Sequence, residues 1–264
     1  MKKALFFTGL LLLSVQIYAQ DRNLFEEQYF IQDEDTLRCR ILTPQNFDIN
    51  KKYPLLVFLH GAGERGTDNI KQLEWGADLF LDSLNRLKFP AIVVFPQCPE
   101  NESWANIKRS EVKDSLGGFT LDTLANAGRT SAMVLRFIDT LLAHGGIDRT
   151  RIYLGGLSMG GFGTFEFLWR RPNLFAAAFP VCGGGSPEKV RLYPKKLPIW
   201  IFHGDADPIV PVQHSRRMVQ ALKKTSAEVK YTEYAGVGHD SWKNVFAEPE
   251  LLAWLFSKKK SSAK

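Results

Sequence analysis

Residues 152–163 read Ile-Tyr-Leu-Gly-Gly-Leu-Ser-Met-Gly-Gly-Phe-Gly, and this stretch decides the fold. Its apolar beginning predicts a strand, and the residues from about Ser158 onward predict a helix. Gly156 and Gly160 flank Ser158 in a G-x-S-x-G pattern at the predicted junction of strand and helix. Because glycine has no side chain, strand and helix can approach closely there while Ser158 projects into a cleft. The pattern indicates a nucleophilic serine; the alternative is an ordinary serine in a small-residue turn.

The chain on both sides of this stretch alternates apolar runs with helical spacing. Strands buried on both faces of a parallel sheet are expected from the almost continuously apolar runs at 54–59, 91–95, 177–181 and 199–202. Further strands are predicted near 28–31, 37–42 and 229–234, and helices near 70–87, 133–142, 212–224 and 249–256. The alternation predicts an α/β fold with a doubly wound, mostly parallel sheet and helices on both faces. We expect a single domain over residues 20–264.

A serine hydroxyl is a weak nucleophile near neutral pH, so Ser158 needs a base and an acid that orients the base. With this motif the acid and then the histidine follow the serine in chain order. Of the three histidines after Ser158, His239 lies in a glycine-rich turn after the last predicted strand, at the edge of the sheet where ligands bind. His203 is expected to be a structural turn residue, and His214 to be solvated on a polar helix. His239 is therefore the predicted base.

Two aspartates after the penultimate strand are candidates for the acid. Asp205 and Asp207 both lie in the stretch His-Gly-Asp-Ala-Asp-Pro that begins at His203. We prefer Asp207 because this loop must reach back toward His239, whereas Asp205 is expected to bind local backbone. Composition alone does not separate the two.

Two backbone N–H groups are predicted to stabilise an oxyanion. One belongs to Met159, the residue after the serine, and the other to Ala62, in the glycine-rich loop after the strand at 54–59. The alternative for this loop is a plain turn between strand and helix. His60, which precedes the loop, is expected to be structural.

The N-terminus is typical of an export signal. Met1-Lys2-Lys3 is followed by an apolar run from Ala4 to Val15 and a small residue at Ala19. A membrane anchor is the alternative, but spanning a bilayer takes about 18 apolar residues or more, and this run is shorter. We predict a signal peptide over residues 1–19 and a periplasmic or secreted bacterial protein.

Charge and cysteine content exclude several classes of partner. The formal net charge is +6, and most of it comes from Lys2, Lys3 and a lysine-rich C-terminus, so the rest is near neutral. We expect no nucleic-acid partner and no stable membrane anchor once the signal is cleaved. Cys39, Cys98 and Cys182 are too few for a disulfide framework or a zinc site, although Cys39 and Cys98 are expected on neighbouring strands. Histidine spacing and the absence of phosphate-binding motifs predict no metal and no cofactor.

Taken together, these motifs resemble the α/β-hydrolase superfamily. More narrowly, the chain is similar to bacterial proteins described as predicted peptidases or phospholipase/carboxylesterases, which are related to dienelactone hydrolases and feruloyl esterases. The matching stretches are 60–66, 96–99, 152–163, 181–185, 203–211 and 234–242. The resemblance implies the α/β-hydrolase fold and a triad of Ser158, Asp207 and His239, and it favours Asp207 over Asp205. Residues 106–127 match poorly and are expected to cap the pocket.

The resemblance and the three residues together predict a serine carboxylesterase that works through an acyl-enzyme. We expect small-molecule or carbohydrate-linked ester substrates, such as acyl or feruloyl esters of plant polysaccharides. Trp104, Trp242 and Phe119 are candidate walls of the substrate pocket, with core packing as the alternative for each. A small-peptide serine hydrolase similar to prolyl oligopeptidases is the alternative enzyme. A non-catalytic binding protein on the same fold is the third hypothesis, although binding needs none of the three residues.

Overall fold

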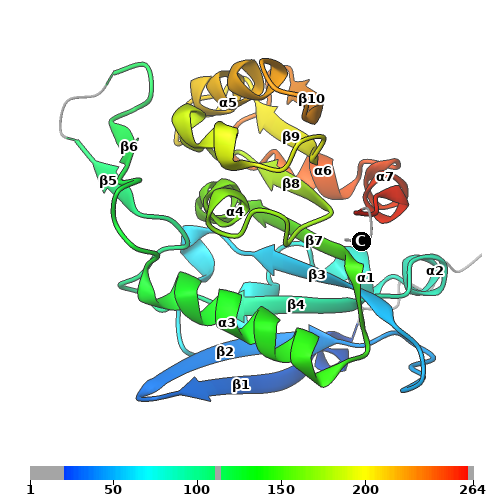
Figure 1. Ribbon diagram of the computed structural model, residues 1–264. Coiled ribbons are helices and arrows are strands. Elements are labelled where there is room, and N and C mark those ends of the chain that lie inside the picture. The colour runs from blue at the N-terminus through cyan, green and yellow to red at the C-terminus, as the bar shows by residue number, and fades with distance from the viewer. Residues whose placement is uncertain (1–20, 111–113, 261–264) are drawn as a thin grey trace, which may run out of the picture.

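The computed structural model describes residues 21–110 and 114–260 (Figure 1). Its central feature is an eight-stranded sheet. Six neighbouring strands are parallel, whereas β2 is antiparallel to both of its neighbours, β1 and β4. The strand order is β1 (Glu26–Gln32), β2 (Asp35–Leu42), β4 (Ile92–Gln97), β3 (Tyr53–Leu59), β7 (Ile147–Leu157), β8 (Ala177–Val181), β9 (Pro198–Gly204) and β10 (Glu228–Tyr234). The predicted α/β class with a mostly parallel sheet is confirmed.

Helices cover both faces of this sheet (Figure 1). One face packs against α3 (Arg129–His144), α4 (Met159–Arg170) and α5 (Gln213–Lys223). The other packs against α1 (Ala77–Leu81), α6 (Trp242–Phe246) and α7 (Leu251–Ser257), and α2 (Ser83–Lys88) follows α1. Strands β3 and β8 are buried along their whole length, as their continuous apolar sequences predicted.

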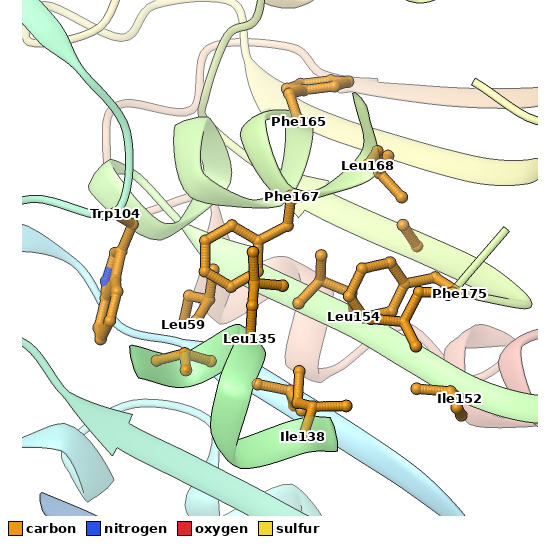
Figure 2. Packing of buried hydrophobic residues seen from close by; sticks show 14 of the residues in the cluster. Leu59, Trp104, Leu135, Ile138, Ile152, Leu154, Phe165, Phe167, Leu168 and Phe175 are labelled. Atoms are coloured by element: carbon orange, nitrogen blue, oxygen red, sulfur yellow. The ribbon is translucent and has the colours of Figure 1, made fainter. Parts of the chain in front are cut away.

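Burial of large apolar side chains from α3, α4 and the sheet holds this side of the molecule together (Figure 2). Phe167 on α4, Leu135 on α3 and Leu154 on β7 belong to one cluster and are almost completely inaccessible to water. Removal of this apolar surface from water is the main stabilising contribution. It also fixes α4, and therefore the residue that precedes it, against the sheet.

Two local predictions differ from the structure. The helix predicted over 70–87 is broken into η3 (Lys71–Leu73), α1 and α2. Gly76 has φ 88° just before α1, and the carboxylate of Asp82 accepts a hydrogen bond from Asn85 N to begin α2. The strand predicted over 91–95 is β4, which continues through Pro96 to Gln97. Because β3 pairs with β4 only up to Val94, the missing N–H of Pro96 removes no bond on that side.

The segment 106–127, which was expected to cap the pocket, contains a small second sheet. It is formed by β5 (Ile107–Arg109) and β6 (Phe119–Leu121), which are antiparallel. Figure 1 shows this hairpin projecting beside the N-terminal end of α4. The sequence did not predict α6, a helix of five residues, because so short a segment carries little periodicity.

Some predictions fall beyond what the structure tests. The predicted signal peptide, residues 1–19, lies outside the described residues, so export stays a prediction, as does the single domain over 20–264. Within 21–110 and 114–260, no helix combines the length and the apolar character needed to cross a bilayer.

Candidate active site

Ser158 lies at the carboxyl end of β7, directly before α4. Its φ of 53° and ψ of −114° belong to a region that residues other than glycine rarely adopt. A Cβ atom on Gly160 would lie 1.9 Å from the carbonyl oxygen of Leu59, and one on Gly156 would lie 2.4 Å from the carbonyl oxygen of Gly160. Both positions require glycine because the turn brings β3, β7 and α4 into backbone contact. The local fold therefore presents Ser158 at the carboxyl edge of the sheet.

His239 joins Ser158 to Asp207 in one hydrogen-bonded chain. Its Nε2 lies 2.9 Å from Ser158 Oγ, and its Nδ1 lies 2.7 Å from Asp207 Oδ2. Because a carboxylate only accepts hydrogen bonds, Nδ1 carries the proton and Nε2 is free to accept the hydroxyl proton of Ser158. The three side chains follow β7, β9 and β10, so the parallel sheet brings together residues that are far apart in the sequence.

The carboxylate of Asp207 is inaccessible to water and densely hydrogen-bonded. Burial, the largest single influence, raises its pKa, but the hydrogen bonds from His203, His239 and the N–H groups of Ile209 and Val210 together lower it by more. The net result is a pKa well below the ordinary range of aspartate. Asp207 therefore stays ionised beside the imidazole across the working pH range of most enzymes.

Asp205 occupies a different position. Its Oδ1 accepts a hydrogen bond of 2.6 Å from Gly236 N, and the residue is exposed. This agrees with the prediction that Asp205 binds local backbone. Of the two candidates, Asp207 faces His239.

His203 is a neighbour of Asp207 that sequence reasoning treated only as a turn residue. It is completely buried, with Nε2 at 2.9 Å from Val210 O and 3.3 Å from Asp207 Oδ2. Its Nδ1 lies 2.7 Å from Ser215 Oγ. The contact with Asp207 depends on the reversal of the chain between the two residues, which the sequence pattern did not reveal.

The two predicted oxyanion donors border the same cavity as Ser158 and His239. Met159 is the first residue of α4, where backbone N–H groups have no partner within the helix. Ala62 begins η2 (Ala62–Glu64), in the loop after β3. The positive end of the α4 dipole adds to the favourable environment for a developing negative charge.

Glu64 supports the loop that carries Ala62. Its Oε2 accepts a hydrogen bond of 2.7 Å from Gly61 N, and its side chain is almost completely buried. Burial raises the pKa of this carboxyl, partly offset by the Gly61 hydrogen bond. Sequence reasoning missed Glu64, although a carboxylate three residues after a turn glycine is a recognisable signal for such a bond.

A cavity of about 590 Å³ opens in front of Ser158. Phe119 and Trp242, two of the three predicted wall residues, line it together with Phe162 and Ile209. The rings of Trp242 and His239 meet edge to face with centroids 5.3 Å apart. Phe119 reaches the cavity from β6, so the segment expected to cap the pocket contributes one of its walls.

The third predicted wall residue, Trp104, lies elsewhere, and the prediction that it lines the pocket is wrong. Its side chain is completely buried in the core beside Leu59 (Figure 2). The indole N–H donates to His60 O at 2.9 Å, and a Cβ on Gly163 would lie 2.3 Å from the Cβ of Trp104. Trp104 therefore supports the loop after β3 from beneath.

Of the other two histidines considered in the sequence analysis, His60 lies where it was predicted and His214 does not. His60 is buried and structural, as predicted: its Nδ1 lies 2.6 Å from Gly61 O, and Cys98 N donates to its Nε2 at 2.9 Å. Burial lowers the pKa of His60 to about 4. The prediction that His214 is solvated is wrong. His214 is buried because Phe119 and Phe162 pack against it, and its Nε2 lies within hydrogen-bond distance of Leu116 O.

The three cysteines are buried and form no disulfide bond. Cys39 and Cys98 lie on or beside neighbouring strands, as predicted, because Cys39 on β2 pairs with Pro96 on β4.

Within the described residues, one group of three potential metal ligands comes close together: Cys182, Asp207 and His239. Asp207 and His239 are bonded to each other, and burial raises the pKa of the Cys182 thiol, which disfavours the thiolate that metals prefer. Asp207 and His239 belong to the hydrogen-bonded chain of Ser158.

Two curated relatives are similar to this chain. Acyl-protein thioesterase 1 of Neurospora crassa is 28% identical over 212 residues, which cover 70% of this chain and 80% of that protein. A probable dipeptidyl-peptidase 5 of Aspergillus terreus is 22% identical over 268 residues, covering 87% of this chain. This chain spans only 35% of the length of that peptidase.

A solved structure is more similar still. The crystal structure of a thermostable esterase superposes with a TM-score of 0.81 at 37% identity and covers 90% of this chain and 64% of its own. A family model described as Phospholipase/Carboxylesterase matches residues 47–249, which confirms the family resemblance seen in the motifs. The chain therefore belongs to the phospholipase/carboxylesterase family of α/β-hydrolases.

Proposed function

We propose that this protein hydrolyses carboxylic esters through a covalent acyl-enzyme on Ser158. The observation that carries the proposal is the chain of hydrogen bonds from Ser158 through His239 to the buried Asp207, which opens into a cavity with apolar walls. Family membership supports the same chemistry.

In the first half of the reaction, Ser158 Oγ attacks the carbonyl carbon of the ester while its proton passes to His239 Nε2. Asp207 stabilises the imidazolium that forms. The N–H groups of Met159 and Ala62 face the oxyanion of the tetrahedral intermediate. Collapse of the intermediate breaks the bond to the alcohol oxygen, which takes the proton from His239, and leaves the acyl group on Ser158.

In the second half, a water molecule replaces the alcohol. His239 removes a proton from the water as it attacks the acyl carbon, and the bond to Ser158 Oγ then breaks. The proton returns to Ser158, the carboxylic acid leaves, and the enzyme is regenerated.

The proposed substrates extend to acyl or feruloyl esters carried by plant polysaccharides. Phe119 and Trp242 offer aromatic surface to an aryl acyl group, and the cavity has room for one. A small-peptide hydrolase is the alternative, supported by the similarity to a dipeptidyl-peptidase. Among the described residues, Glu64 is the carboxyl that lines the cavity and could pair with a peptide amine, and its Oε2 is already bonded to Gly61 N.

The test is hydrolysis of 4-nitrophenyl acetate, butyrate and octanoate and of methyl ferulate, beside a proline-containing peptide anilide. We expect ester turnover that Ser158→Ala lowers to near background, a loss on the order of 10⁶-fold in kcat. Ser257→Ala, which removes an exposed hydroxyl on α7, is the matched control and should keep its activity. Folded protein that cleaves the anilide faster than every ester would overturn the esterase proposal in favour of the peptidase.

A further inference from the structure

Two arginines that the proposed chemistry does not use line the catalytic cavity. Arg65 comes from the loop after β3, directly after Glu64, and Arg109 comes from β5. They reach the cavity from different parts of the chain. The cavity around Ser158 therefore carries two positive charges that neither bond making nor proton transfer requires.

The guanidinium of Arg65 is the more unusual of the two. Its Nε is buried and has no hydrogen-bond acceptor in the described parts of the chain, and no ion pair is formed by the side chain there. The residue as a whole is only partly buried, but a buried N–H donor without an acceptor is unfavourable unless a ligand supplies one. Arg65 therefore offers an anionic ligand a buried Nε–H donor in addition to its positive charge.

Arg109 is held in place by an aromatic ring. Its guanidinium carbon lies 4.8 Å from the centroid of Phe119, and within residues 21–110 and 114–260 the guanidinium has no carboxylate partner. Stacking on a ring orients a guanidinium but leaves its N–H donors in the ring plane available. Phe119 itself stacks on Phe162 and is thereby fixed in the wall of the cavity.

Within residues 21–110 and 114–260, a single carboxyl lines the cavity beside these arginines. It belongs to Glu64, and its Oε2 already binds Gly61 N. The apolar wall formed by Phe119, Phe162 and Ile209 lies in the same cavity. A ligand that fits both features has an apolar portion and an anionic group.

We propose that the preferred esters carry a carboxylate, which Arg65 binds with the help of Arg109. This inference rests on the proposed esterase activity and narrows its substrate class to anionic esters. Bidentate pairing with a carboxylate would satisfy the guanidinium of Arg65, and such charge-assisted bonds are roughly twice as strong as neutral ones.

Matched pairs of esters test the proposal. On the acyl side, mono-4-nitrophenyl adipate is compared with 4-nitrophenyl hexanoate, which has a methyl group in place of the carboxylate. On the alcohol side, 4-carboxybenzyl butyrate is compared with 4-methylbenzyl butyrate. The arm that shows the preference identifies which half of the ester carries the anion. The readout is the ratio of the kcat/KM values within each pair, so a general change in activity cancels.

We expect wild-type protein to favour the anionic ester in one pair. Arg65→Gln should lower the ratio of kcat/KM for the anionic ester to kcat/KM for its neutral partner about tenfold, as the loss of one charged hydrogen bond predicts. Arg109→Gln, on the exposed hairpin, should lower it about threefold and cannot disturb the core. Arg136→Gln removes the same charge from the outer surface of α3 and should leave the ratio unchanged. Equal ratios in wild type, Arg65→Gln and Arg109→Gln for both pairs would overturn the proposal while leaving the esterase activity intact.

A binding measurement separates this inference from the esterase proposal. Calorimetric titration of Ser158→Ala with monomethyl adipate should detect binding that the added Arg65→Gln substitution weakens about tenfold. If wild-type protein turned over no ester while Ser158→Ala showed such binding, the catalytic proposal alone would be contradicted. Binding that is equal with and without Arg65 would contradict the anion site alone.

Discussion

At the scale of single residues, the environment of each aspartate decides its role. Asp207 and Asp205 are two positions apart, yet the Asp207 carboxylate binds His239 Nδ1 whereas Asp205 binds Gly236 N. Asp207→Asn places an amide where the imidazole needs an acceptor, so the tautomer that serves as base is disfavoured. We expect kcat for ester hydrolysis to fall by about 10⁴-fold.

Asp205→Asn is the matched control for this prediction. An asparagine oxygen can still accept from Gly236 N, and the residue is exposed, so activity should stay within about twofold of wild type. Steady-state kinetics on one 4-nitrophenyl ester decides between the two residues. A larger loss of activity in Asp205→Asn than in Asp207→Asn would show that Asp205, and not Asp207, is the acid.

At the scale of elements, the close contact between α4 and β3 sets the position of the serine. The Cβ of Gly160→Ala would lie 1.9 Å from Leu59 O, a backbone atom that cannot move without shifting the buried strand. We expect a loss of about 3 kcal/mol or more in the free energy of unfolding, measured by guanidinium titration, or no folded protein at all.

Gly63→Ala provides the comparison, because a Cβ there meets no atom within 4 Å. Its free energy of unfolding should remain within about 0.5 kcal/mol of wild type. If Gly160→Ala were as stable as Gly63→Ala, the contact between α4 and β3 would not be the constraint that positions Ser158.

At the scale of the whole molecule, a buried neutral histidine makes global stability depend on pH. His60 accepts from Cys98 N through Nε2, so a second proton on the ring has no acceptor, and burial lowers its pKa from 6.5 to about 4. Between these values the unfolded chain binds a proton that the folded protein excludes, so stability falls as the pH is lowered from 6.5 toward 4. The loss from His60 should reach about 3 kcal/mol.

Denaturant titrations at several pH values measure this loss. His60→Gln should flatten the dependence between pH 6.5 and 4, even if it lowers stability at every pH. The pKa of His214 is also lowered by burial, so part of the dependence should survive in the variant. His144→Gln, at an exposed position on α3, should leave the dependence unchanged. An unchanged slope in His60→Gln would contradict the assignment of the acid sensitivity to this residue.

The sequence by itself determined the features that depend on neighbouring residues. Continuous apolar runs specify strands buried on both faces, and the glycines around Ser158 specify a turn that no larger residue permits. These local patterns were sufficient for the fold class and for the predictions of Ser158 and His239, whereas the choice of Asp207 over Asp205 also needed the resemblance to a known family.

Only the tertiary structure decided which side chains share an environment. It buried Trp104 beneath the loop after β3, brought Phe119 and Trp242 to the cavity, placed His203 behind Asp207 and left Arg65 without an acceptor in the described chain. Each of these outcomes depends on side-chain direction and on contacts between segments far apart in the sequence. Hydrophobicity and spacing describe which residues are buried or exposed along one element, but they do not specify what those residues contact across elements.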